Sequence, residues 1–466
     1  MTALLNAGRA ADDEQHLPTD AGPPTGPSVA GRSLNLVQNS IALIGAKVAI
    51  MSLGFIFWLV AARQFDAGTV GLAAGAVSAV MLCTQFALLG VGSSFITHLP
   101  AHRARPHRLL HAATTLVAVA SAVVALLFLL FSGIFLDELA TLAREPLFDV
   151  AFVLVAVVGT LGILLDQVST AFRRGDQALA RNVVSGGITL GHLVLLAVLM
   201  RNPSANAIFA TWLTGGVALL AVGYVQMRGP IPEYRYRPVL GRRVARELLG
   251  VGIPNHLLTL TERLPGFVLP IVVIEVLSPA QNAHWYTAWM MAWVVYIIPI
   301  QVGMTLFAEA TDEPHQITAH LRRGIKTSLV LGVLAACGAA LLAPVALGLL
   351  GPGYAAAAVT PLRILVIGVV PLTVIHGYFA VCRATRRLGE ALVVGTMSAV
   401  GGTVAASVAA VGGGLPAMAA TWVAALTVAC IWAAFRLHSL MRLFEEPMAV
   451  TSDIPEFAVA ARTLEP

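Results

Sequence analysis

Apolar runs of about 20 residues recur along the chain, and short polar segments separate them. A helical run of this length crosses the roughly 30 Å hydrocarbon layer of a bilayer, because each helical residue rises about 1.5 Å. The pattern predicts twelve membrane spans, at residues 36–62, 68–97, 109–135, 148–172, 178–200, 205–227, 251–277, 284–307, 325–350, 358–382, 389–411 and 415–437. We therefore expect an all-α integral membrane protein.

The composition supports this fold class. Hydrophobic residues make up 58% of the chain and charged residues 11%, whereas about a quarter of the residues of a soluble domain are charged. The net charge of +5 does not indicate a nucleic-acid partner, because the basic residues lie in short loops, where they set membrane topology. The four cysteines lie inside apolar runs without a CxxC spacing, so we expect neither a metal site nor a cofactor.

The positive charges lie mainly on one side of the predicted membrane. Of the 29 Lys and Arg residues, 23 lie in the tails, in the loops that follow even-numbered spans or at the span ends next to these loops, and three lie in the opposite loops. Loops with such an excess face the cytoplasm, so we predict that both termini are cytoplasmic. Arg outnumbers Lys 27 to 2, which is typical of a GC-rich bacterial genome, so we expect the membrane to be a bacterial inner membrane. The polar first 35 residues predict a disordered tail without a signal peptide.

The two halves of the chain resemble each other. A long polar segment, 228–250, separates six spans from six, and a shift of 210 residues places Ala210-Thr211-Trp212 on Ala420-Thr421-Trp422. Duplicated halves are common in secondary transporters, whose substrate site lies between them near the midplane of the membrane. We predict a tail (1–35), a first lobe (36–228), a linker (229–250), a second lobe (251–437) and a second tail (438–466), with the pseudo-symmetric lobes around a central cavity.

The seventh span carries polar residues at the depth of the membrane centre. Asn255, Thr259, Glu262, Arg263 and Gly266 follow the spacing i, i+4, i+7, i+8, i+11, which places them on one face of a helix. Arg263 lies roughly 18 Å from the start of the span. A charge at that depth costs a few kcal/mol and usually faces a protein interior or a wet cavity, so we expect this face to line the cavity.

The repeat predicts a second cation at the same depth. A shift of 216 residues places Asn39 on Asn255 and Lys47 on Arg263. In a medium of low dielectric constant, paired cations suit a pyrophosphate or an acidic sugar, since Arg offers a planar fork of donors and Lys a compact charge. The predicted substrate-binding residues are Lys47, Arg263, Asn39, Asn255, Thr259 and Glu262.

The acidic residues of the spans leave two interpretations open. Glu262 or Asp166 could couple transport to an ion gradient, although a neighbouring arginine weakens the role of a proton carrier. Alternatively, Arg263 pairs with one of these carboxylates and only holds helices together.

Four short motifs resemble those of polysaccharide flippases in the multidrug/oligosaccharidyl-lipid/polysaccharide exporter superfamily. They are AARQFDAGTVG at 61–71, LLGVG at 88–92, LLGPGYA at 349–355 and PLRIL at 361–365. In that family the first two helices are joined by a similar turn, and the second helix ends in Leu-Gly-x-Gly. The chain departs from the family at Leu88 and Thr97, where many relatives carry an acidic residue and an arginine.

The resemblance implies two six-helix lobes, alternating access and export of polyprenyl-pyrophosphate-linked oligosaccharide for assembly of exopolysaccharide or cell-envelope glycan. The implied partners are this lipid-linked substrate, membrane lipids, and glycan polymerases or glycosyltransferases of the same pathway. Multidrug exporters and lipid II flippases of the superfamily are the alternative transporters. An enzyme, a membrane glycan polymerase, is the alternative outside the transporter class. Such enzymes usually need a sizeable extramembrane segment with catalytic carboxylates. Because the outward loops here are short, we expect no enzyme activity.

Overall fold

The computed structural model describes residues 49–445, except 103–104, 146, 201, 232–233 and 239–240. Asn39 and Lys47 lie outside the described residues. Within the described part the regular structure is helical, without strands, and the predicted all-α fold is confirmed.

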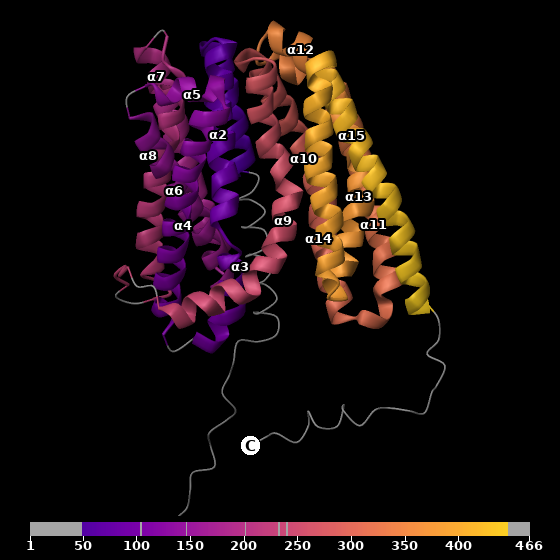
Figure 1. Ribbon diagram of the computed structural model, residues 1–466. Coiled ribbons are helices and arrows are strands. Elements are labelled where there is room, and N and C mark those ends of the chain that lie inside the picture. Colours follow the sequence, from indigo (N-terminus) through magenta and orange to yellow (C-terminus); the bar gives the residue numbers. More distant parts are fainter. Residues whose placement is uncertain are drawn as a thin grey trace, which may run out of the picture.

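The helices form two bundles that lie side by side (Figure 1). The first bundle contains the helix Ala49–Gln64, α2 (Ala67–Ala87), α3 (Val91–His98), α4 (Pro106–Phe135), α5 (Asp137–Ala143), α6 (Phe148–Ala171), α7 (Gly175–Leu199) and α8 (Ala205–Met227). The second bundle contains α9 (Arg242–Val276), α10 (Pro279–Asp312), α11 (Ile317–Gly348), α12 (Pro352–Ile367), α13 (Val369–Ala384), α14 (Leu388–Thr396) and α15 (Gly402–Glu445). A π-helical segment, Met397–Gly401, joins α14 to α15.

The described residues include ten helical segments that are long and apolar enough to cross a membrane. The last of them, Leu388–Arg442, is 55 residues long and bends at Gly414, whose φ of 62° and ψ of −157° are not helical. This bend separates the two spans predicted at 389–411 and 415–437. The helix Ala49–Gln64 is shorter and forms the described part of the first predicted span.

The family-like motifs lie at the ends of helices. The carboxylate of Asp66 accepts a hydrogen bond from the backbone N–H of Thr69 over 2.9 Å and caps α2. Burial raises the pKa of Asp66, but hydrogen bonds from Thr69 and neighbouring groups lower it overall. Gly90 has a φ of +72° where α2 ends and α3 begins, and Gly351 has a φ of +144° before α12. These left-handed conformations favour glycine, which explains two glycines of the motifs.

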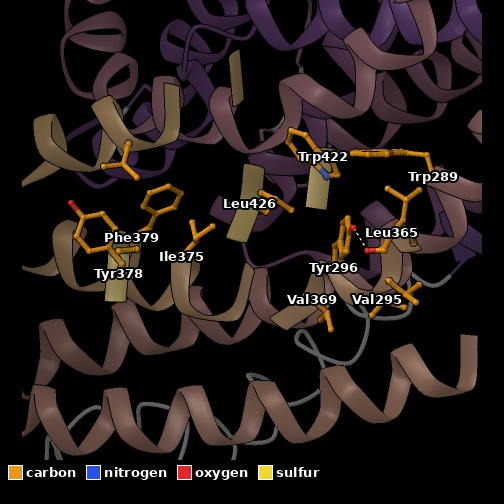
Figure 2. Packing of buried hydrophobic residues seen from close by; sticks show 14 of the residues in the cluster. Trp289, Val295, Tyr296, Leu365, Val369, Ile375, Tyr378, Phe379, Trp422 and Leu426 are labelled. Carbon is orange, nitrogen blue, oxygen red and sulfur yellow. Dashed lines mark hydrogen bonds between the residues drawn. The ribbon is translucent and has the colours of Figure 1, made fainter. Parts of the chain in front are cut away.

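A cluster of buried aromatic and aliphatic side chains forms the core of the second bundle (Figure 2). The ring of Trp289 on α10 lies 5.9 Å from that of Trp422 on α15. On the next turns of α10, the Tyr296 hydroxyl donates a hydrogen bond to the carbonyl of Leu365 on α12. A Cβ on Gly266 would lie 2.8 Å from the indole nitrogen of Trp289, so this position of α9 fits closely against the same core.

The two ends of the molecule differ in charge and in how the bundles meet. We call the end at which α9 begins and α13 turns into α14 the basic end, because it carries Arg242, Arg243, Arg246, Arg383, Arg386 and Arg387 (Figure 1). At the opposite end α2 packs directly on α9 and α10. The side-chain amide of Asn282 donates to the carbonyl of Gly71 over 2.8 Å, and a Cβ on Gly75 would lie 1.9 Å from Ile274.

Candidate substrate site

α9 is the element that brings the predicted polar residues to the contact between the bundles. Its membrane-crossing part runs from Gly252 to Val276 and contains Pro254, Pro265 and Pro270. Each proline leaves one helical hydrogen bond unmade and favours a bend. Glu262 and Arg263 lie near the middle of this crossing, as the apolar pattern predicts.

Three of the predicted residues form an accessible row along α9. Asn255 and Arg263 are exposed and Thr259 is half-buried; the Thr259 hydroxyl donates to the Asn255 carbonyl over 3.2 Å. The four-residue spacing places these side chains one above another on the helix. The row therefore offers an amide, a hydroxyl and a guanidinium to the same space.

Arg263 reaches toward the first bundle. Its Nη1 lies 3.5 Å from Oε1 of Gln85, a long contact, and Gln85 is 2% exposed on α2. His256 lies about two helical turns before Arg263, toward the basic end, and its Nε2 lies 2.7 Å from the backbone carbonyl oxygen of Gln85. No carboxylate of the described residues lies within 4 Å of the Arg263 guanidinium. Arg263 therefore lies deep in the membrane-crossing region without an ion pair in the described chain. Its guanidinium N–H donors are free to bind an anionic ligand.

Glu262, the neighbour of Arg263 in sequence, faces the second bundle instead. Its Oε1 accepts a hydrogen bond from Nη2 of Arg383 over 2.9 Å and lies 3.9 Å from Nδ1 of His376. The side chains of Glu262 and Arg383 are 10% and 9% exposed. Among the described residues Glu262 forms its ion pair with Arg383 and makes no direct ion pair with Arg263, so the contacts do not support the alternative interpretation in which these neighbours pair.

Asp166 belongs to a separate polar cluster in the first bundle. Its Oδ1 accepts from Nη2 of Arg181 over 2.6 Å, and both carboxylate oxygens accept from Asn182. Arg181 is fully buried, whereas Asp166 is 33% exposed. The charge pattern groups Arg181 with the basic residues of the neighbouring loop, but α7 begins at Gly175, so this arginine lies within the helix.

A comparable cluster lies in the second bundle. Glu390 on α14 accepts hydrogen bonds from Arg436 on α15 and from the Tyr378 hydroxyl over 3.1 Å. In the first bundle, the oxygen of Gln226 on α8 accepts from Arg181 on α7 over 2.7 Å. Gln226 and Arg436 differ by the 210 residues of the internal repeat, so both bundles join their last two helices through a polar contact at corresponding positions.

Sequence spacing did not identify Gln85, Arg383 or Arg181 as partners of the predicted site residues. Gln85 and Arg383 lie 178 and 121 residues from the side chains that they contact. A signal was present for Arg181, since an arginine that follows the start of an apolar run by only a few residues can lie inside the helix.

Among the described residues, no group of three or more His, Cys, Asp and Glu side chains could hold a metal ion.

No family model and no curated protein matches the sequence. Solved structures do match its fold. An inward-facing multidrug resistance MATE family transporter of the MOP superfamily aligns with a TM-score of 0.62 and 16% identity over 84% of this chain and 95% of that one. The lipid II flippase MurJ in an inward closed conformation aligns with a TM-score of 0.69 and 12% identity over 86% and 87%.

A third solved structure is a MOP superfamily transporter from Pyrococcus furiosus, described as having a binding pocket of reverse polarity that suggests a different function. It aligns with a TM-score of 0.59 and 14% identity over 87% of this chain and 96% of that one. The chain is thus a multi-pass membrane protein with the fold of MOP superfamily transporters. At sequence identities this low, the structural alignments show the fold and do not identify the transported molecule. The nature of the cargo has to be inferred from the chemistry of the site.

Proposed function

We propose that this protein is a transporter that flips a polyprenyl-pyrophosphate-linked oligosaccharide across the bacterial inner membrane by alternating access. The glycan would serve exopolysaccharide or cell-envelope assembly, with polymerases or glycosyltransferases of that pathway as partners. Both termini would face the cytoplasm, so the basic end is the cytoplasmic end.

The observation that carries the proposal is Arg263. It lies near the middle of a membrane-crossing helix, is exposed, and has no carboxylate partner among the described residues. The nearby carboxylate of Glu262 is already neutralised by Arg383. A net positive, hydrogen-bonding surface at this depth favours a cargo with phosphate groups, because charge-assisted hydrogen bonds strengthen in a medium of low dielectric constant.

Asn255 and Thr259 extend this surface toward the basic end. Both can exchange hydrogen bonds with sugar hydroxyl groups, and both precede Arg263 by whole steps of four residues on α9. Lys47, which lies outside the described residues, is proposed as the second cation because the repeat aligns it with Arg263. Glu262 would contribute indirectly, by holding Arg383 and orienting α9.

Two other cargos are the alternatives. A multidrug exporter is suggested by the MATE family neighbour, but a cationic drug would meet Arg263 rather than a free carboxylate. The reverse polarity described for the Pyrococcus furiosus transporter supports the idea that this fold accepts pockets of either sign. The lipid II flippase MurJ makes lipid II the specific rival among lipid-linked cargos.

The test is a translocation assay in proteoliposomes with a fluorescent prenyl-pyrophosphate-linked oligosaccharide. We expect Arg263→Ala to slow translocation roughly 10- to 100-fold, since a hydrogen bond to a charged group contributes about 1.5–3 kcal/mol. Arg263→Lys, which keeps the charge, should retain most of the rate. The double variant Lys47→Ala/Arg263→Ala should be slower still.

Arg363→Ala is the matched control. Arg363 is also an exposed arginine of a membrane-crossing segment, but it lies on α12, and its Nε donates to the Ala340 carbonyl over 3.1 Å. Its removal should leave translocation unchanged. Normal translocation by well-expressed Arg263→Ala protein would overturn the proposed mechanism, and transport of a cationic drug in place of the lipid-linked glycan would overturn the proposed cargo.

A further inference from the structure

The first turns of α9 form an amphipathic segment at the basic end. In Figure 1 this segment runs across the end of the first bundle before α9 turns to cross the membrane, and the membrane-crossing part begins at Gly252. One side of the segment faces the first bundle. Leu248 is fully buried in its core, and Glu247 lies 3.6 Å from Nε2 of His102.

The other side of this segment borders a pocket of about 640 Å³ that is open to the outside rather than enclosed. The described residues that line it are Arg242, Ala245, Arg246, Leu249, Gly250 and Ile253. Arg242 and Arg246 are separated by one helical turn, so their guanidinium groups lie on the same side. Both are exposed, and neither has a carboxylate partner among the described residues.

The intervening arginine differs from these two. Arg243 donates to Oε1 of Glu247 over 3.3 Å and does not line the pocket. The helix therefore separates a paired arginine from two unpaired ones. Guanidinium groups are suited to phosphate, since their planar fork of donors matches its oxygens.

The pocket changes from charged to apolar toward the membrane. Leu249 and Ile253 follow Arg246 by three and seven residues, and Leu257 continues the same face. Ile253 and Leu257 are 37% and 39% exposed. A ligand with a phosphate head and a hydrocarbon chain could place its head on the arginines and its chain along these side chains. Neither a free anion nor a purely apolar ligand would use both parts.

We infer that this pocket is the site at which the phosphate groups of the lipid-linked cargo first bind, before the cargo reaches Arg263. This inference rests on the proposed function, because it assigns the pocket to the same cargo. Arg246 and Arg263 are 17 residues apart on α9, roughly 25 Å along a helix. α9 thus carries an arginine at the proposed first binding site and another at the deeper site, and the cargo would move from the first to the second.

The experiment measures equilibrium binding of farnesyl pyrophosphate to the full-length protein in phosphatidylcholine nanodiscs, in an Arg263→Ala background that removes the proposed deeper site. The probe carries both a pyrophosphate and a prenyl chain. We expect Arg242→Gln/Arg246→Gln to weaken binding about 25-fold, roughly fivefold for each arginine near a membrane surface. Arg243→Gln removes the same charge from the same helical turn and should change the affinity less than twofold. Because these three arginines are exposed, unfolding does not interfere, and circular dichroism confirms the helix content.

Competition experiments distinguish a prenyl pyrophosphate from the two other sources of phosphate, a free anion and a phospholipid headgroup. Inorganic pyrophosphate should bind at least tenfold more weakly than farnesyl pyrophosphate, because it lacks the chain. Ten mole per cent phosphatidylglycerol should leave probe binding nearly unchanged. Equal binding of inorganic pyrophosphate, full displacement by phosphatidylglycerol, or equal losses in Arg243→Gln and the double variant would each overturn the assignment.

The two proposals fail in different ways. If Arg242→Gln/Arg246→Gln protein binds the probe and translocates the glycan normally while Arg263→Ala protein does not translocate, the docking pocket is wrong and the proposed function stands. If the wild type translocates no lipid-linked glycan but its probe binding still depends on Arg242 and Arg246, the proposed function is wrong. The pocket then stands as a site for a prenyl-pyrophosphate lipid of another process.

Discussion

Two carboxylates of the membrane-crossing helices, Asp166 and Glu262, are each paired with an arginine of the same bundle. Arg181 pairs with Asp166 in the first bundle, and Arg383 pairs with Glu262 in the second. Each pair joins helices of one bundle, so its charges are balanced before any ligand arrives. Arg263 is different, because the described chain gives it only the long contact with Gln85. At the residue scale, the excess positive charge near the centre of α9 therefore comes from one side chain.

The pair of Arg181 and Asp166 gives a prediction for stability. Arg181→Met should lower the free energy of unfolding by about 2–3 kcal/mol, because it leaves the Asp166 carboxylate without its cation. This value lies at or below the usual range for breaking a buried pair, since Asp166 is one-third exposed. Unfolding in detergent, followed by circular dichroism, measures the change.

The double variant Arg181→Met/Asp166→Leu is the control for this prediction. It removes both charges, so it should be more stable than Arg181→Met alone. If the single variant is as stable as the wild type, the pair contributes nothing measurable and Arg181 requires another explanation.

The sequence predicted where the charges of α9 lie but not what they contact. Neighbouring residues of a helix project about 100° apart, so Glu262 and Arg263 can point toward different bundles although both lie on the polar side. The partner of Glu262 is 121 residues away. Helical spacing cannot reveal such a partner, because only the folded arrangement of the second bundle brings the Arg383 side chain of α13 to it.

At the element scale, glycines set how closely α9 approaches the first bundle. A Cβ on Gly90, at the start of α3, would lie 2.2 Å from the Gly252 carbonyl oxygen, and a Cβ on Gly252 would lie 2.4 Å from the Gly90 oxygen. The two backbones are in direct contact where α9 enters the membrane-crossing region. The family-like LLGVG motif at 88–92 thus has a packing function at the contact between the bundles.

Gly90→Ala should destabilise the protein by about 2–4 kcal/mol. A non-glycine residue at a φ of +72° costs roughly 1–2 kcal/mol, and the overlap with Gly252 adds about 1–3 kcal/mol when the backbones are pushed apart. Unfolding in detergent measures the loss. Gly133→Ala is the matched control, because nothing lies within 4 Å of its added Cβ, and it should stabilise α4 by up to about 1 kcal/mol. Equal effects of the two substitutions would contradict this account of the contact.

The apolar pattern located whole helices well and their polar extensions poorly. The span predicted at 205–227 coincides with α8, Ala205–Met227, because its ends are polar on both sides. The span predicted to start at 251 belongs to α9, which begins at Arg242. The extra turns carry arginines and glutamate on a surface helix, so a search for continuous apolar runs does not find them.

At the scale of the whole molecule, direct contacts of α2 and α5 with α9 and α10 join the bundles at the end opposite the basic end. Besides the contacts of Gly71 and Gly75, the carboxylate of Glu275 near the end of α9 accepts hydrogen bonds from the backbone N–H groups of Glu138 and Leu139 over 3.1 and 2.9 Å. These N–H groups belong to the first turn of α5, where a negative charge is favourable. Alternating access requires these contacts to break when the cargo leaves.

Glu275→Ala should therefore increase the population in which the opposite end is open. Loss of two hydrogen bonds to a partly exposed carboxylate corresponds to about 1 kcal/mol, or about fivefold in population. A cysteine at Ala283 reports the opening, since Ala283 is 1% exposed and lies against α2. In a background without Cys83, Cys337, Cys382 and Cys430, a membrane-impermeant maleimide added from the opposite side should label Ala283→Cys about fivefold faster when Glu275 is alanine.

A cysteine in place of Ala380 is the control, because Ala380 is fully buried inside the core of the second bundle and should stay unlabelled in both backgrounds. Lipid-linked cargo should also accelerate labelling at position 283, because transport carries the protein through the open state. Slow labelling at position 283 that neither Glu275→Ala nor cargo changes would mean that the bundles stay joined at this end. Alternating access would then be wrong for this protein, since a cargo bound at Arg263 would have no exit between the bundles.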